Sequence, residues 1–198
     1  MNGELFGEPI FRTILIDPPW TEAGGGGRGA QNHYPLVPTR ELPSLIRGSG
    51  LFRPFADAAH LYLWVTNNYL PHGLWLMEQL GFRYVTNLPW NKPGMGIGQY
   101  FRGEHELLLF GVVGHGQSPA VLTERRDLGT RIDADWVRER GRKVHSAKPT
   151  EAYERIQARS KGPYLEMFAR GAPRSPEWTV WGNEARPANG ATTAGGEP

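Results

Sequence analysis

The sequence contains no cysteine, which excludes disulfide bonds and thiolate-bound zinc or iron–sulfur centres. It also lacks any apolar run near the roughly 20 residues that a membrane-spanning helix needs. The first residues, Met1-Asn2-Gly3-Glu4, do not follow the basic and then apolar order of a signal peptide. These absences lead us to expect a soluble, cytoplasmic protein with no membrane contact.

The composition fits one folded domain. The length of 198 residues suits a single hydrophobic core, and 39% hydrophobic with 21% charged residues argues against wholesale disorder. The formal net charge of +2 is compatible with a polyanionic partner but too small to require one. We expect a single domain over residues 1–184, and the Gly, Ala, Pro and Thr content of residues 185–198 predicts a disordered tail.

Strand and helix patterns alternate along the chain, which is typical of an α/β sheet. Short apolar or β-branched runs predict strands at residues 11–16, 61–66, 82–90, 106–113, 164–169 and 178–181. Helices are expected after Thr39 as N-cap, over residues 70–80 before Gly81, and over residues 150–160 with Pro149 in the first turn. The strands at 82–90 and 106–113 can pair as a long hairpin.

Two segments lack such patterns. Residues 115–147 are polar and arginine-rich with acidic residues interspersed, so we interpret them as a variable basic insert. This insert is either a solvated charged surface or a target-recognition element. The glycines at 24–27 are not followed by the Gly-Lys-Ser/Thr of a phosphate-binding loop, and a closing lid is the preferred interpretation of residues 21–37.

The motif Asp17-Pro18-Pro19-Trp20 follows the first predicted strand. Proline has a fixed φ and no backbone N–H, so the Asp17 carboxylate is held rigidly and the carbonyls beside it have no local donor. Such a corner suits a substrate that brings N–H donors, and an adenine amine brings two. We expect Asp17 and a proline carbonyl to accept those hydrogen bonds, while Trp20 stacks on the base. The alternative interpretation is an ordinary turn.

The motif resembles the catalytic signature of the MT-A70-like family of N6-adenine methyltransferases, which modify messenger RNA or bacterial and phage DNA. Further segments resemble that family in the same order: residues 61–66, 89–92, 99–106, Lys148-Pro149, 165–170 and 181–184. The resemblance covers about residues 11–184 without the insert. It implies an α/β, Rossmann-like class I methyltransferase fold in permuted order, with the Asp-Pro-Pro-Trp strand before the cofactor-binding strand.

The resemblance also implies S-adenosylmethionine as cofactor. Its binding residues by motif are Asp17, Lys148, Arg170, Asn183 and Glu184. The chemistry agrees, because lysine or arginine can pair with the cofactor's carboxylate and an asparagine amide suits ribose hydroxyls. The sequence departs from the family at Gly171-Ala172-Pro173, where some members carry polar residues that touch the ribose.

Other residues were weighed as substrate or metal contacts. Tyr34, Trp90 and Lys92 are candidates for substrate binding beside Trp20, whereas Trp64 and Trp181 lie inside apolar strands and are expected in the core. The run Glu104-His105-Glu106 contains metal-ligand types, but adjacent strand residues point to opposite faces, so we expect no metal site.

The function that these observations favour is site-specific methylation of adenine N6 in DNA with S-adenosylmethionine. The alternatives are an RNA N6-adenosine methyltransferase, a catalytically silent nucleic-acid-binding subunit of the same fold, and a small-molecule amine methyltransferase. The expected partner is nucleic acid, with DNA preferred over RNA, and a homo- or heterodimer is possible.

Overall fold

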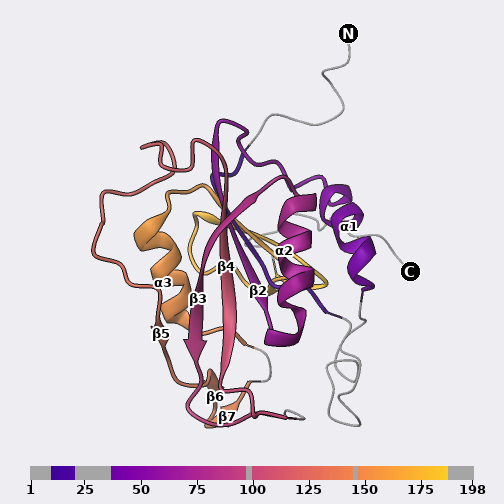
Figure 1. Cartoon of the computed structure of the whole chain (residues 1–198), viewed down its shortest axis with the longest axis vertical. Coiled ribbons are helices and arrows are strands. Elements are labelled where there is room, and N and C mark those ends of the chain that lie inside the picture. Colours follow the sequence, from indigo (N-terminus) through magenta and orange to yellow (C-terminus); the bar gives the residue numbers. More distant parts are fainter. Residues whose placement is uncertain (1–9, 21–36, 97–99, 145–146, 187–198) are drawn as a thin grey trace.

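A seven-stranded sheet forms the centre of the protein in a computed structural model that describes residues 10–20, 37–96, 100–144 and 147–186 (Figure 1). The strand order is β10-β8-β1-β2-β4-β3-β5. These strands are β1 (Thr13–Ile16), β2 (Ala58–Val65), β3 (Arg83–Asn91), β4 (His105–Gly114), β5 (Ile132–Asp133), β8 (Tyr164–Met167) and β10 (Trp178–Trp181). Two short pairs lie outside this sheet: β9 (Arg170–Gly171) with β11 (Glu184–Ala185), and β6 (Arg138–Glu139) with β7 (Arg142–Lys143).

Strand direction decides which residues meet at each edge of the sheet. β1 runs parallel to β2 and β8, and β8 runs parallel to β10. β4 runs antiparallel to both of its neighbours, β2 and β3. The first residues of β4 therefore lie at the edge where the other strands end, so that His105 pairs with Asn91 and Leu107 pairs with Val65.

Helices cover both faces of the sheet, and Figure 1 shows α1 and α2 on one side and α3 on the other. Strand side chains alternate between the two faces. Ile14 and Leu63 pack with α1 (Leu42–Gly48) and α2 (Leu70–Gln79), while Leu15 and Trp64 pack with α3 (Thr150–Arg159). Short 3₁₀ turns, η3 (Thr39–Glu41) and η4 (Asn67–Tyr69), precede α1 and α2. Within the described part of the chain, no helix combines the length and apolar character needed to span a membrane.

The predicted strands and the hairpin are confirmed, with bounds that differ by a few residues. The predicted helices at 70–80 and 150–160 are also confirmed and begin at the expected residues, whereas the start of the first helix differs. Thr39 is the first residue of η3 and makes no capping bond, because Pro38 takes the N-cap position and Pro43 opens α1 without a backbone N–H to satisfy. Pro149 is likewise the extended N-cap of α3, and its carbonyl accepts the N–H of Ala152 at 3.1 Å.

The segment expected as a variable basic insert contributes to the core. Ile132 in β5 is 1% exposed, and Val121 is fully buried. β5 extends the sheet beside β3, and the indole N–H of Trp90 donates to the Ala134 carbonyl at 3.0 Å. Val121 lies in the short apolar run 120–122 and Ile132 lies between Arg131 and Asp133, so these core residues produce no helix or strand period in the sequence.

The disordered tail was expected to begin at residue 185, but this residue still belongs to a strand. Ala185, placed in the tail, belongs to β11 and pairs with Gly171. The next residue, Arg186, donates its N–H to the Gly171 carbonyl at 2.8 Å. Residues 187–198 lie outside the described residues.

Truncation of Ile132 tests whether the insert is part of the core. We expect Ile132→Ala to lower the free energy of unfolding by about 2–5 kcal/mol, because a buried side chain would leave a cavity. Urea denaturation would measure this change. The matched control is Glu139→Ala, an exposed residue of the same insert, with an expected change below about 0.5 kcal/mol. Equal small changes for both variants would show that the insert is only loosely attached.

Candidate functional site

Asp17 lies directly after β1, between the ends of two parallel strands. Its backbone N–H donates to the carbonyl of Met167, the last residue of β8, at 3.3 Å. Its side chain is 26% exposed, and the Nζ of Lys148 donates to Oδ2 at 2.7 Å. Lys148 comes just before α3 and is only 9% exposed. A nearly buried ammonium thus holds one oxygen of the carboxylate at the carboxyl edge of the sheet.

Glu106 extends this ion pair into a chain of alternating charges. The Nζ of Lys148 lies 3.6 Å from Oε2 of Glu106, and Lys92 forms an ion pair with Oε1 of the same carboxylate. Glu106 reaches Lys148 because the antiparallel β4 begins at this edge, where β3 ends and the chain continues into Lys92. Two lysines and two carboxylates therefore balance each other in a largely buried cluster.

Burial and charge act differently on the members of this cluster. Burial raises the pKa of Asp17, and Lys148 and Arg170 offset that shift only in part. Burial also disfavours ionised Glu106, but Lys148 and Lys92 outweigh it and lower the pKa of Glu106. For Lys148, burial would lower the pKa, yet the two carboxylates raise it. Lys148 therefore stays protonated, and Asp17 is the carboxyl whose charged form is the less favoured by its surroundings.

Both proline carbonyls beside Asp17 accept hydrogen bonds, and the donor to Pro18 is local, contrary to the expectation. The Pro18 carbonyl accepts the N–H of Trp20 at 2.9 Å, and the Pro19 carbonyl accepts the N–H of Val37 at 3.3 Å. The second donor comes from a residue that is distant in sequence, so the motif alone could not reveal it. Each carbonyl oxygen has two lone pairs and can still accept one further hydrogen bond.

Trp20 anchors the motif in the core, which disagrees with the expected stacking on a base. The side chain is 6% exposed and packs beside Tyr69 with ring centroids 5.3 Å apart. Its indole N–H donates to the carbonyl of Trp64 near the end of β2 at 3.0 Å. The apolar ring is buried and its N–H has an acceptor, so the indole is stable inside the core and is not available to stack on a base.

Trp90 has a similar place on the other face of the sheet, although it was expected to bind substrate. It is 2% exposed and packs edge-to-face against Trp64 and Trp136. The burial of Trp64 in the core is as expected. Lys92 lies at the site through its ion pair with Glu106, whereas Tyr34 lies outside the described residues.

Three of the predicted cofactor residues meet at the ends of β8 and β10. Arg170 and Glu184 are register partners in the β9–β11 pair, and Asn183 directly precedes Glu184. These three side chains are exposed. Gly182 allows the close approach of the two strand ends, because a Cβ there would lie 2.8 Å from the backbone nitrogen of Ala169. The charge of Arg170 also acts on Asp17 and Lys148, so this group borders the charge cluster.

Glu106 is the site residue that sequence reasoning missed. Its run was weighed for metal binding and counted in the family resemblance, but Glu106 itself was not named as a site residue. In the described ranges no three His, Cys, Asp or Glu side chains are placed to hold a metal ion. The available signal was the predicted hairpin, which brings the start of the second strand to the edge where the first one ends. That topology places Glu106 near the carboxyl ends of the neighbouring strands.

Substitution of the lysines tests the electrostatics of the cluster. We expect Lys148→Met to raise the pKa of Asp17 further, because the charge that favours its ionised form is lost. The matched control, Lys92→Met, should raise the pKa of Glu106 and leave that of Asp17 nearly unchanged. Carboxyl NMR titration of the labelled side chains measures both values. A lower or unchanged pKa of Asp17 in Lys148→Met would contradict the assignment of Lys148 as its counter-ion.

Comparison with known proteins identifies the family of the chain. The model of the MT-A70 family matches residues 11–184. A relative in Medicago truncatula, named "Putative N(6)-adenosine-methyltransferase MT-A70-like", is 27% identical over 187 residues, which are 88% of this chain and 26% of that protein. The chain thus spans about a quarter of the length of that relative. The match to the family model extends over most of the sequence, and the chain belongs to the MT-A70 family.

Proposed function

We propose that the chain is an S-adenosylmethionine-dependent methyltransferase that modifies N6 of adenine in DNA. The observation that carries the proposal is the partly exposed Asp17 carboxylate at the carboxyl edge of the sheet, where open α/β sheets bind their ligands. The mixed sheet covered by helices on both faces is a Rossmann-like methyltransferase fold. The permuted order, with the Asp17 strand before the cofactor-binding strand, is part of the proposal.

The residues at this edge fit the cofactor of the family. MT-A70 methyltransferases use S-adenosylmethionine, which supplies an electrophilic methyl group when bound. Arg170 and Lys148 have the charge to pair with its carboxylate, and Asn183 and Glu184 offer amide and carboxylate groups for hydroxyls. The approach of the β8 and β10 ends at Gly182 gathers Arg170, Asn183 and Glu184 on one side of Asp17.

The two oxygens of Asp17 have separate tasks in the proposed mechanism. Lys148 binds Oδ2, and no described residue donates to Oδ1. Oδ1 can therefore accept an N–H of the adenine amine and orient the nitrogen lone pair toward the methyl group. In a methyl transfer the carbon–sulfur bond of the sulfonium would break as the carbon–nitrogen bond forms, and Asp17 would stabilise the positive charge on the nitrogen and accept the proton that the amine loses. Because burial raises the pKa of Asp17, Oδ1 is also a better proton acceptor than an exposed aspartate.

Removal of the carboxylate tests this role. We expect Asp17→Ala to lower turnover by about a hundredfold or more, in line with the loss of one preorganised electrostatic group. The measurement is transfer of labelled methyl groups to adenine-containing oligonucleotides. Asp57→Ala is the matched control, because Asp57 is an exposed carboxylate paired with Arg12. Turnover of Asp17→Ala within a few-fold of the parent would refute the proposed mechanism.

The choice of DNA rests on the resemblance to the bacterial and phage members of the family, which modify DNA. The relative from Medicago truncatula is named for adenosine, which favours RNA as the second candidate. We expect methylation of DNA when matched DNA and RNA pools compete for labelled S-adenosylmethionine, with chromatographic detection of N6-methyladenine. Label in the RNA with none in the DNA would establish the second candidate.

A further inference from the structure

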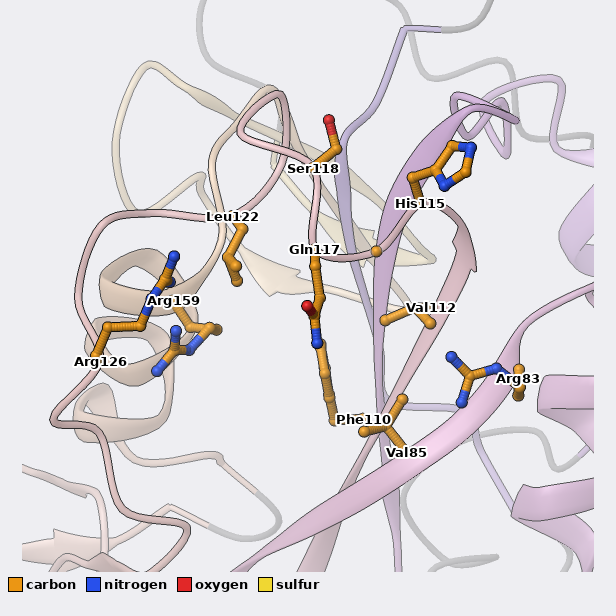
Figure 2. A pocket seen from close by; sticks show the side chains of 11 residues that line it. Arg83, Val85, Phe110, Val112, His115, Gln117, Ser118, Leu122, Arg126 and Arg159 are labelled. Carbon is orange, nitrogen blue, oxygen red and sulfur yellow. The ribbon is translucent and has the colours of Figure 1, made fainter.

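A cavity of about 830 Å³ lies away from Asp17, where β3 begins and β4 ends (Figure 2). Its remaining walls come from the first part of the insert and the last turn of α3. Six residues give it its chemical character: Arg83, Arg126 and Arg159 are cationic, and Val85, Phe110 and Leu122 are apolar. None of the residues that line it is acidic.

The cavity is separate from the charge cluster at Asp17. Glu106 and Val112 are six positions apart on β4, which corresponds to about 20 Å along an extended strand. Glu106 belongs to the cluster, whereas Val112 lines the cavity. A group that occupies the cavity therefore cannot be the adenine held by Asp17.

The arginines present unused donors to this space. Figure 2 shows Arg126 and Arg159 together on one wall and Arg83 on the opposite one. Arg126 donates to the Thr123 carbonyl at 3.0 Å and Arg159 to the Arg125 carbonyl at 2.6 Å, each through Nη1. A guanidinium has five N–H donors, so both keep several. Among the described residues, none of the three arginines forms an ion pair, whereas Arg125 is paired with Asp127.

A buried polar network supports one wall of the cavity. Nε2 of His60 donates to the carbonyl of Gly116, which lines the cavity, and Nδ1 accepts a hydrogen bond from Ser160 at 2.6 Å. Tyr62 donates to the same serine hydroxyl at 2.7 Å. The network ties the start of the insert and the end of α3 to the central strand β2, so the wall is held in place.

We propose that this cavity binds a nucleoside phosphate, either free or as part of a nucleic-acid strand. Clustered guanidinium groups without carboxylate partners recognise phosphate oxygens by paired hydrogen bonds. The apolar surface of Val85, Phe110 and Leu122 suits the flat face of a base. A volume of about 830 Å³ is ample for a nucleotide. This binding activity is additional to methyl transfer and does not depend on it.

Adenine-free probes test the cavity without involving the amine-binding corner at Asp17. Binding of thymidine 5′-monophosphate is measured by calorimetry, and binding of a fluorescein-labelled oligothymidylate by anisotropy. Arg126→Gln and Arg83→Gln each remove one guanidinium, and Val85→Glu places a negative charge on the apolar surface. The matched control is Arg40→Gln, which removes one charge from an exposed side chain that does not line the cavity.

We expect Arg126→Gln and Arg83→Gln to weaken binding by roughly tenfold and Val85→Glu by more, with Arg40→Gln close to the parent. Weakening seen with the mononucleotide would identify a free nucleotide as sufficient, and weakening confined to the oligothymidylate would identify a strand. The proposal is overturned if the parent binds neither probe, or if the cavity variants bind both probes as well as Arg40→Gln does. Methylation assays on the same variants report separately on the site at Asp17.

Discussion

The ion pair between Lys148 and Asp17 is the contact on which the candidate site depends. It joins residues 131 positions apart, and so connects the end of the first strand to the segment that opens the last helix. A lysine this deeply buried remains charged only because Asp17 and Glu106 both face it. The same contact fixes Oδ2 of Asp17, and because no described residue donates to Oδ1, the proposed mechanism assigns that oxygen to the substrate amine. Stability and the proposed chemistry thus share one electrostatic arrangement.

The direction of β4 places it in two candidate sites, one at each edge of the sheet. Since β4 runs against its neighbours, its first residues carry Glu106 to the edge where the parallel strands end. Its last residues reach the other edge and form part of the arginine-lined cavity. A parallel strand in this position would bring the residues after Gly114, instead of Glu106, to the site at Asp17. The hairpin therefore supplies a counter-ion to one site and a wall to the other.

The sequence predicted local structure well and contacts between distant segments less well. Strands such as 61–66 could be recognised because continuous apolar runs reflect burial on both faces. The core residues of the insert could not, since Val121 belongs to an apolar run of only three residues and Ile132 lies between two charged residues. The roles of Trp20 and Trp90 were misjudged for a related reason. An indole is readily buried where a carbonyl oxygen accepts its N–H. The accepting carbonyls belong to Trp64 and Ala134, which are distant in sequence from Trp20 and Trp90.

In the Asp-Pro-Pro-Trp motif, Asp17 is the partly exposed residue, and the residues that follow it hold it in place. The Asp17 N–H is bound to the end of β8, and the Trp20 indole is bound to the end of β2. The two prolines between Asp17 and Trp20 restrict φ, so the carboxylate is fixed between the ends of β8 and β2, the strands on either side of β1. On this geometry Trp20 contributes by positioning Asp17. In the proposed mechanism the tryptophan would therefore act through the orientation of the aspartate, and recognition of the base would fall to other segments around the edge of the sheet.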